Sequence, residues 1–148
     1  MQNHDGQTAL HKANSEHVVE AILEYLTPEQ RVIAISVQDL KGSTALHNAA
    51  EIGNPEIVRS LLSCLTAGQK FDANKIKNKN GKTALDIACE RNKYYTALAI
   101  LRNLSPEHKH KLIVAEDGRS TAIALAKENH HQEIVDMLAE YKNLNSTD

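Results

Sequence analysis

The strongest constraint on the fold of this chain is a short motif that returns at nearly constant intervals. The tetrapeptide Thr-Ala-Leu-His begins at Thr8 and at Thr44, Thr-Ala-Leu-Asp begins at Thr83, and a weaker copy, Thr-Ala-Ile-Ala, begins at Thr121. The four threonines are separated by 36, 39 and 38 residues. Because a fixed period of about 20–50 residues is typical of stacked repeats, this spacing predicts four similar units that fill the chain.

A second motif follows the first in every unit. Its four copies are His17-Val18-Val19, Glu56-Ile57-Val58, Tyr95-Thr96-Ala97 and Glu133-Ile134-Val135, at intervals of 39, 39 and 38. In the second unit the apolar residues are Ile57, Val58, Leu61, Leu62 and Leu65, which lie on one face of a helix. The Thr-Ala-Leu segments begin a shorter helix that is rich in alanine. Each unit is therefore predicted to be a pair of helices.

The second unit also resembles a known family. Residues 42–62 read G-x-T-A-L-H-x-A-A-x-x-G-x-x-E-I-V-x-x-L-L, which is similar to the ankyrin repeat. This resemblance implies an all-α solenoid in which each unit has a short inner helix, a longer outer helix and a projecting β-turn finger. It also implies that His11 and His47 form hydrogen bonds that tie neighbouring fingers together. We expect one domain, residues 1–148, with repeats at approximately 4–36, 37–75, 76–113 and 114–145.

Extra residues follow the outer helix in the first three units, because units of 38 and 39 residues exceed the usual length of about 33. The segments that begin at Thr27, Thr66 and Ser105 recur at intervals of 39. A Thr or Ser, often followed by Pro and then by Gln three residues past the cap, is typical of a helix start. We therefore predict a third, short helix in each linker. Its apolar side would be formed by Val32, Ile33 and Ile35, then by Phe71, and then by Leu112 and Ile113.

The first and last units are predicted to be irregular. Three residues are missing between Ala13 and Val18, so the first inner helix should be stunted. The turn between the paired helices favours a left-handed residue, which Gly53 supplies freely and His130 supplies less comfortably. The last unit also carries Lys127 where the second has Ala50, and a polar outer face of this kind is typical of a terminal cap.

The ankyrin resemblance implies that a partner protein binds to the fingertips and to the exposed side of the inner helices. The candidate contact residues are Asn48, Glu51, Ile52, Lys79, Lys82, Ile87, Glu90, Arg91, Leu125 and Glu128. If Ile52, Ile87 and Leu125 are exposed together, they form an apolar strip rimmed by charge, which is usual in protein interfaces. The alternative is that some of them point into the stack. The fourth fingertip is predicted to carry Glu116, Asp117, Arg119 and Ser120.

Within this set we expect affinity to come mainly from Ile52, Ile87, Glu90 and Arg91. Lys79 and Lys82 are expected to steer an acidic partner towards the face. These lysines belong to the most basic stretch of the chain, residues 75–82. A nucleic-acid partner is not expected, because the stretch lies on one finger and lacks the aromatic platforms that single strands stack on.

Metal binding is not expected from the histidine pairs. His108 and His110, like the adjacent His130 and His131, lack the i, i+4 spacing of metal ligands on a helix. One of the paired residues Tyr94 and Tyr95 is expected to pack and the other to be exposed.

Catalysis is not expected either. The two cysteines, Cys64 and Cys89, are expected to be reduced core thiols, and Cys89 takes the place of Ala50 in the helix. The sequence contains no nucleophile elbow, no phosphate-binding loop and no dinucleotide fingerprint. We therefore expect neither an active site nor a cofactor.

The net charge and the hydropathy of the whole chain bear on its partners and its location in the cell. The formal net charge is −2, so there is no overall attraction to nucleic acid or to an anionic membrane. No apolar run approaches the roughly 20 residues of a spanning helix, and the first residues lack a signal-peptide pattern. We expect a cytoplasmic, monomeric, non-catalytic protein-binding module. The alternative is a recognition domain of a larger enzyme or of a secreted effector, since the long linkers resemble ankyrin proteins that intracellular bacteria deliver into host cells.

Overall fold

The computed structural model of the chain describes residues 2–114 and 120–146, which form eleven helices. The inner layer consists of α1 (Ala9–Lys12), α4 (Ala45–Ile52), α7 (Ala84–Glu90) and α10 (Thr121–Glu128). The outer layer consists of α2 (Glu16–Glu24), α5 (Pro55–Ser63), α8 (Tyr94–Arg102) and α11 (Gln132–Ser146). The linkers contain α3 (Pro28–Ser36), α6 (Ala67–Lys75) and α9 (Pro106–Ile113).

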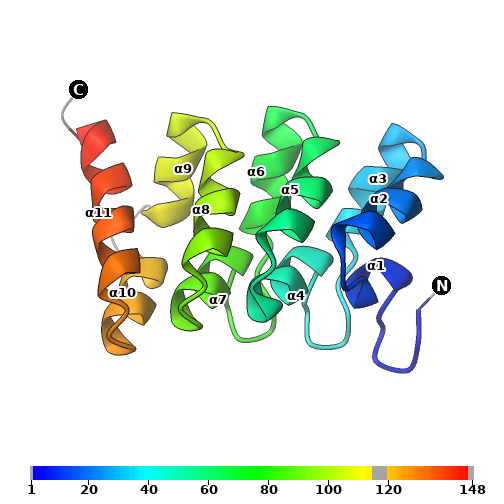
Figure 1. Cartoon of the computed structure of the whole chain (residues 1–148), viewed down its shortest axis with the longest axis horizontal. Helices are drawn as coiled ribbons and strands as arrows, with labels where there is room; N and C mark the ends of the chain where they lie inside the picture. The colour runs from blue at the N-terminus through cyan, green and yellow to red at the C-terminus, as the bar shows by residue number, and fades with distance from the viewer. Residues whose placement is uncertain (1, 115–119, 147–148) are drawn as a thin grey trace.

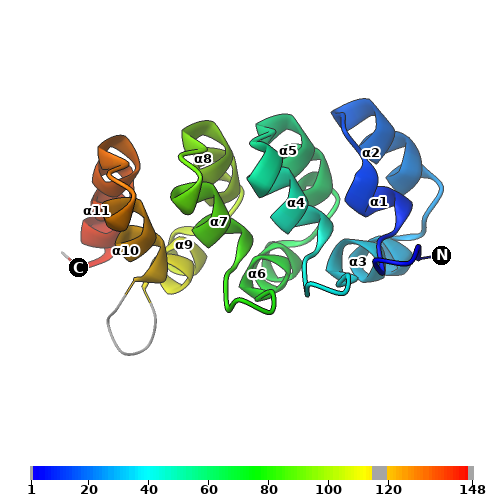
Figure 2. The same ribbon diagram turned by 90° about the horizontal axis from the view of Figure 1, so that it is seen from below.

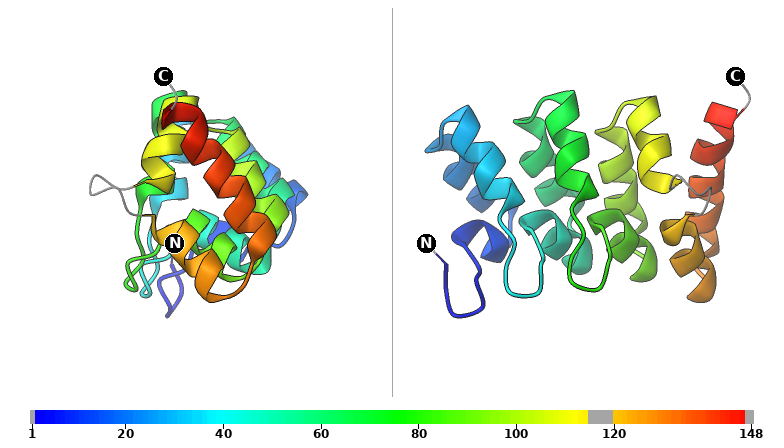
Figure 3. Two further views of the ribbon diagram at one scale, coloured as in Figure 1. Left: turned by 90° about the vertical axis from the view of Figure 1, so that its left-hand side faces the viewer. Right: turned by 180° about the vertical axis from the view of Figure 1, so that it is seen from behind.

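The helix pairs stack side by side along the long axis of the molecule (Figure 1). Viewed from below, the inner helices form one row and the linker helices α3, α6 and α9 form another (Figure 2). The loops that lead into α1, α4 and α7 project on the same side of the stack (Figure 3). No strand occurs in residues 2–114 and 120–146, so the predicted all-α solenoid of helix pairs is confirmed.

The recurring threonines start the inner helices by capping them. Thr44 is the N-cap of α4, where its Oγ1 accepts from the backbone N–H of His47 and the His47 Nδ1 accepts from the N–H of Thr44 at 3.0 Å. Thr83 forms the same reciprocal capping box with Asp86 on α7. Such boxes satisfy backbone donors that the first turn leaves free. The fourth unit differs, because Ser120 is the N-cap and Thr121 is already helical.

The turns between paired helices adopt the left-handed conformation that the sequence predicts. Gly53 has φ 83°, while the equivalent Asn92 and His130 have φ 57° and φ 61°. Glycine adopts this region without a steric penalty, whereas a residue with a Cβ does so less readily. The last turn therefore carries local strain that the second turn does not.

The core runs without a break through the stack. Leu46, Leu85 and Leu101 are fully buried, and the alanines of the inner helices, such as Ala49 and Ala88, are buried between neighbouring helices. Burial of one large aliphatic side chain stabilises a fold by about 1.5–3 kcal/mol, and alanine allows helices to approach closely. Because each unit covers the apolar side of the next, no unit hides its own core alone.

The linker helices form as predicted, and their N-termini are capped. Thr27 with Gln30 and Thr66 with Gln69 form capping boxes, and Ser105 caps α9. On the predicted apolar side, Ile35 and Ile113 are buried, and Val32, Phe71 and Leu112 pack against the core. Ile33 is the exception, since 66% of its surface is exposed. It points to solvent because Val32 and Ile35 already occupy the buried side of α3.

The two end units depart from the regular pattern in different ways. The first inner helix, α1, has only 4 residues, which confirms the predicted stunting. In the last unit, α11 makes its main contacts with α10 and α9, whereas α2, α5 and α8 pack one against the next. Figure 1 shows α11 tilted away from α8 towards its C-terminal end. The outer layer is therefore continuous over three units and opens before the fourth.

Candidate partner-binding face

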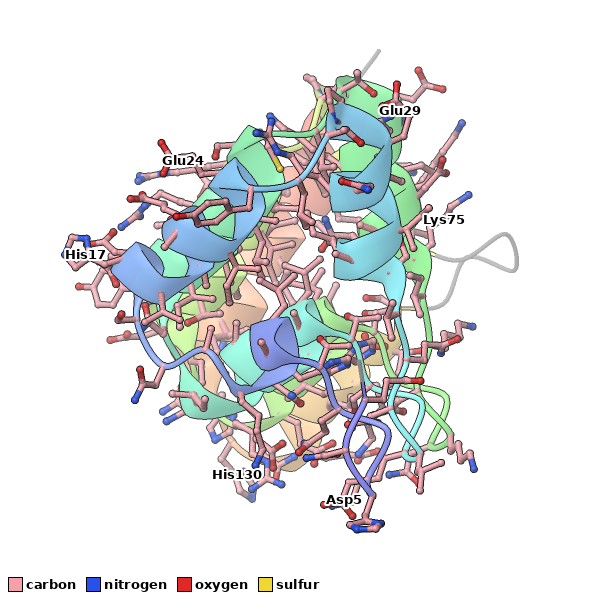
Figure 4. All side chains as sticks on the ribbon, turned by 90° about the vertical axis from the view of Figure 1, so that its right-hand side faces the viewer. Asp5, His17, Glu24, Glu29, Lys75 and His130 are labelled. Atoms are coloured by element: carbon pink, nitrogen blue, oxygen red, sulfur yellow. The ribbon has the colours of Figure 1, made fainter. Side chains whose placement is uncertain are left out.

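Each finger is held by hydrogen bonds within its own turn and by hydrogen bonds to the neighbouring finger. In the second finger, the Asp39 Oδ1 accepts from the backbone N–H groups of Lys41 and Ser43, both at 2.9 Å. Asn3 and Asn78 make the same pairs of bonds in the first and third fingers. Such Asx bonds stabilise tight turns. Figure 4, which looks along the stack from the N-terminal end, shows Asp5 at the tip of the first finger and His17 on the outer layer.

Hydrogen bonds also run from finger to finger. The backbone N–H of Leu40 donates to the Asp5 carbonyl at 2.9 Å, and that of Lys79 donates to the Lys41 carbonyl at 3.0 Å. Gly42 has φ 78°, and a Cβ there would lie 2.9 Å from the backbone nitrogen of Lys79, so only glycine allows this approach. The fingers thus form one continuous, ordered edge over the first three units.

The motif histidines add a further link, as the resemblance implied. The His11 Nε2 lies 2.9 Å from the Ser43 carbonyl oxygen, and the His47 Nε2 lies 2.9 Å from that of Lys82. Since the Nδ1 of His47 accepts a hydrogen bond, its Nε2 carries the proton and donates it to the next finger. Burial lowers the pKa of His47, which favours this neutral form.

A hollow of about 380 Å³ lies between the second and third fingers and the inner helices behind them. Six predicted contact residues line it: Glu51, Lys79, Lys82, Ile87, Glu90 and Arg91. Leu40 and Lys41 from the second fingertip complete its rim. The face predicted from the sequence is therefore a concave surface in the middle of the stack.

Two ion pairs hold the charged residues of this hollow in place. The Lys82 Nζ is paired with the Glu90 carboxylate, which joins the third finger to α7, and both side chains are about three-quarters buried. The Arg91 Nη2 lies 3.4 Å from the Glu51 Oε1, which joins α7 to α4. Because these pairs are formed within the chain, their side chains lose little conformational entropy when a partner docks. Lys82 is also partly neutralised, which leaves Lys79 as the more available positive charge.

The three apolar candidates do not form one strip. Ile52 is exposed over 59% of its surface, whereas Ile87 and Leu125 are half-buried, and Ile87 packs against the core. The physical reason is their register. Ile87 and Leu125 occupy the same repeat position, near the middle of the inner helix, while Ile52 lies at the C-terminal end of α4. Ile52 is therefore an isolated exposed apolar side chain at the end of α4, next in sequence to Glu51, which lines the hollow.

The remaining candidates lie at the edge of the face. The Asn48 Nδ2 donates to the His11 carbonyl at 3.2 Å, which ties α4 to α1. Glu128 is exposed at the end of α10. Of the predicted fourth fingertip, Ser120 is the N-cap of α10, and Glu116, Asp117 and Arg119 lie outside the described residues.

Leu40 was not chosen as a contact residue from the sequence. It is exposed over 62% of its surface at the tip of the second finger. The signal was present, because the equivalent position of the third finger is Lys79, and a leucine on an exposed turn has no packing role. The fingertip thus contributes an apolar contact beside its charges.

Neither cysteine lines the hollow, and nor does His131. Cys89 is buried and Cys64 is half-buried, and burial raises the pKa of both thiols, which favours the unreactive protonated form. The His131 Nδ1 lies 2.9 Å from the Cys89 carbonyl oxygen, so this histidine joins the third and fourth units. Within residues 2–114 and 120–146, no group of three or more His, Cys, Asp or Glu side chains is placed to hold a metal ion.

The tyrosine pair is resolved by the structure. Tyr94 packs against the core, while Tyr95 is exposed over 73% of its surface, and the two rings meet edge to face with centres 5.3 Å apart. Among the described residues, no helix is both long enough and apolar enough to cross a membrane.

Comparison with protein families supports the same architecture. A sequence model of ankyrin repeats (three copies) matches residues 1–68 and 32–110, which together span most of the 148 residues. A search of curated proteins found no match.

Proposed function

Because the chain belongs to the ankyrin-repeat family, whose repeats generally act as protein–protein interaction modules, we propose that it is a non-catalytic module that binds its partner through the fingertips and inner helices of the second and third units. The observation that carries the proposal is the hollow of about 380 Å³ framed by these two fingers. This concave surface combines an ordered backbone with apolar and charged side chains, which is typical of a recognition site.

Affinity in this arrangement comes from a small number of contacts. Leu40, which lines the hollow, and Ile52 at the end of α4 are exposed apolar side chains, and they lose contact with water when a partner covers them. Glu90 and Arg91 offer hydrogen-bonding groups that are already oriented by their ion pairs. A partner therefore meets a preformed surface and little further ordering is required.

The charge of the fingers favours an acidic partner. Lys41 and Lys79 are exposed on neighbouring fingertips, and Lys77 is exposed at the base of the third finger. None of the three forms an ion pair among the described residues. Opposite charge on a partner would raise the association rate, and this effect should weaken with salt.

The experiment compares binding-face variants with a matched control. Ile52→Ala, Ile87→Ala and Arg91→Ala would be combined, with Tyr25→Ala on the outer layer as the control for removing an exposed apolar side chain. A photo-reactive residue at position 79 should cross-link the partner captured from a cytosolic extract, while the same residue at position 24 should not. The triple variant is expected to weaken binding of that partner by at least about tenfold, which corresponds to about 1.4 kcal/mol.

Circular dichroism would verify that the triple variant is folded. Unchanged partner binding by a folded triple variant would show that the proposed face is wrong. Cross-linking at position 24 alone would place the interaction on the outer layer instead.

A further inference from the structure

A second surface lies on the opposite, outer side of the stack, where the outer layer opens. A groove of about 620 Å³ runs between α8 and α11, and no inner helix or finger contributes to it. Its volume falls within the range of about 300–1,000 Å³ that is usual for ligand pockets. The fingertip face contributes no residue to this groove, so the groove is a separate candidate site.

Tyrosine is the unusual residue at this place. Tyr95 stands at the second position of α8, where the other units have His17, Glu56 and Glu133. Its ring is largely exposed, and Tyr94 supports it edge to face. A large aromatic ring that contributes little to the core is a common feature of binding surfaces.

The opposite wall of the groove is acidic. Glu133, Asp136 and Glu140 follow one another on one face of α11 and line the groove, and all three are exposed. None of them forms an ion pair among the described residues, and the Asp136 Oδ1 accepts only from the Gln132 Nε2, at 2.7 Å. Arg102 is the single basic side chain that lines the groove. The groove therefore keeps an uncompensated negative charge, in contrast to the paired charges of the fingertip face.

Tyr141 shows how a cation sits on the aromatic wall. The Lys109 Nζ lies 5.1 Å from the centre of the Tyr141 ring, within the distance of a cation–π contact. Tyr95 lines the same groove as Glu133, Asp136 and Glu140, and its ring is the more exposed of the two. A lysine or arginine side chain can lay its aliphatic part on the tyrosine and place its charge near the carboxylates.

We infer that the groove between α8 and α11 is a docking site for a basic segment of a partner protein. Tyr95 covers the aliphatic part of a lysine or arginine side chain, and Glu133, Asp136 and Glu140 bind the charges of the segment. Together with the fingertip face, the groove would make the chain a two-sided adaptor that carries an acidic partner on one side and a basic partner on the other.

The test uses a defined probe and the full chain. The probe is a fluorescein-labelled peptide of alternating arginine and serine, and the control peptide has glutamate in place of arginine. Binding would be followed by fluorescence anisotropy at low and high salt, and NMR shifts would locate the contact. The first variant is Glu133→Gln/Asp136→Asn/Glu140→Gln, and the second is Tyr95→Ser. Glu16→Gln/Glu20→Gln/Glu24→Gln and Tyr25→Ser are matched controls on α2.

The acidic triple variant is expected to bind the arginine peptide at least about tenfold more weakly, and Tyr95→Ser about three- to tenfold more weakly. The α2 controls should stay within about twofold of the original protein, and NMR shifts should cluster on α8 and α11. Equal losses in the α2 controls would show non-specific attraction and would overturn the inference. Concentration-dependent self-association that Tyr95→Ser abolishes would overturn it as well, because the occupant would then be a second copy.

Discussion

The second and third units meet in both layers, whereas the third and fourth units meet mainly in the inner layer. Between the second and third, α4 packs on α7 and α5 packs on α8. Between the third and fourth, α7 packs on α10, but α11 turns to α9. The inner helices therefore pack on one another at both junctions. Whether the neighbouring outer helices also pack on one another differs from junction to junction.

One repeat position differs in side-chain size between the two junctions. Ser60 faces the preceding outer helix, since its Oγ donates to the Glu20 Oε1 on α2 at 3.3 Å. The equivalent residues are Ala99 on α8 and Met137 on α11. Small side chains at this position let outer helices lie close together, and we predict that the longer Met137 keeps α11 apart from α8. This repeat position is therefore our candidate for the control of outer-layer closure.

The largest expected effect comes from removing a core side chain of the closed stack. Leu101 is fully buried, and the equivalent residue of the last unit is the half-buried Ala139. Leu101→Ala should leave a cavity and lower the free energy of unfolding by about 2–5 kcal/mol in urea titrations. Leu98→Ala on the same helix is the control. Leu98 is only partly buried, so its loss should be clearly smaller, and a loss as large as that of Leu101→Ala would contradict the assignment of Leu101 to the centre of the core.

A smaller loss of stability is expected when methionine, the residue of the last unit at this repeat position, replaces Ala99 at the junction of α5 and α8. Ala99→Met should overpack the contact of α8 with α5 and cost about 1–3 kcal/mol of unfolding free energy. It should also raise amide hydrogen exchange along α5 and α8, which Ala124→Met on the exposed side of α10 should not do. Unchanged stability and exchange in Ala99→Met would mean that this column does not control closure.

Several features of both junctions were predictable from the sequence and others were not. Thr44, His47 and Gly53 could be placed because each acts locally, through a cap, a motif contact or a left-handed turn. The tilt of α11 could not be predicted, because it depends on how the helix packs on α9 and α10 across the stack. The half-burial of Ile87 could not be predicted for a similar reason. How much of a side chain on a surface helix is exposed depends on how closely the neighbouring helices pack.

The position of the candidate face could be predicted in part on the same grounds. Its position between the second and third fingers follows from the repeat, and six of the ten proposed contact residues line the hollow there. The pairing of Lys82 with Glu90 was not foreseen, because it joins a finger to a helix through side-chain geometry. Whether these residues bind a partner stays a prediction.

A third effect concerns the hydrogen bond that fastens the closed junction. His47 donates to the Lys82 carbonyl, whereas the equivalent Asp86 of the next unit cannot donate when it is ionised. His47→Gln keeps an acceptor for the cap and should cost about 1 kcal/mol at pH 7.5, because the bond to the next finger is weakened.

This loss should depend on pH in a defined direction. Burial lowers the pKa of His47 below its usual value of about 6.5, so the unfolded chain takes up the proton first. The contribution of His47 is therefore complete above about pH 6.5 and declines as the pH falls further. The difference in unfolding free energy between His47→Gln and the original chain should shrink below that pH. A constant difference from pH 7.5 to 5 would contradict the proposed link.

The smallest expected effect lies at the open junction. Tyr95→Ser removes a ring that is mostly exposed, so the unfolding free energy should change by no more than about 0.5 kcal/mol. Tyr94→Ser is the matched change one residue earlier, and it should cost clearly more because Tyr94 packs against the core. Thermal unfolding of both variants would measure the contrast. If Tyr95→Ser destabilised the chain as much as Tyr94→Ser, the Tyr95 ring would contribute to the packing of the fold. The groove at the open junction could then not be regarded as a surface free for binding.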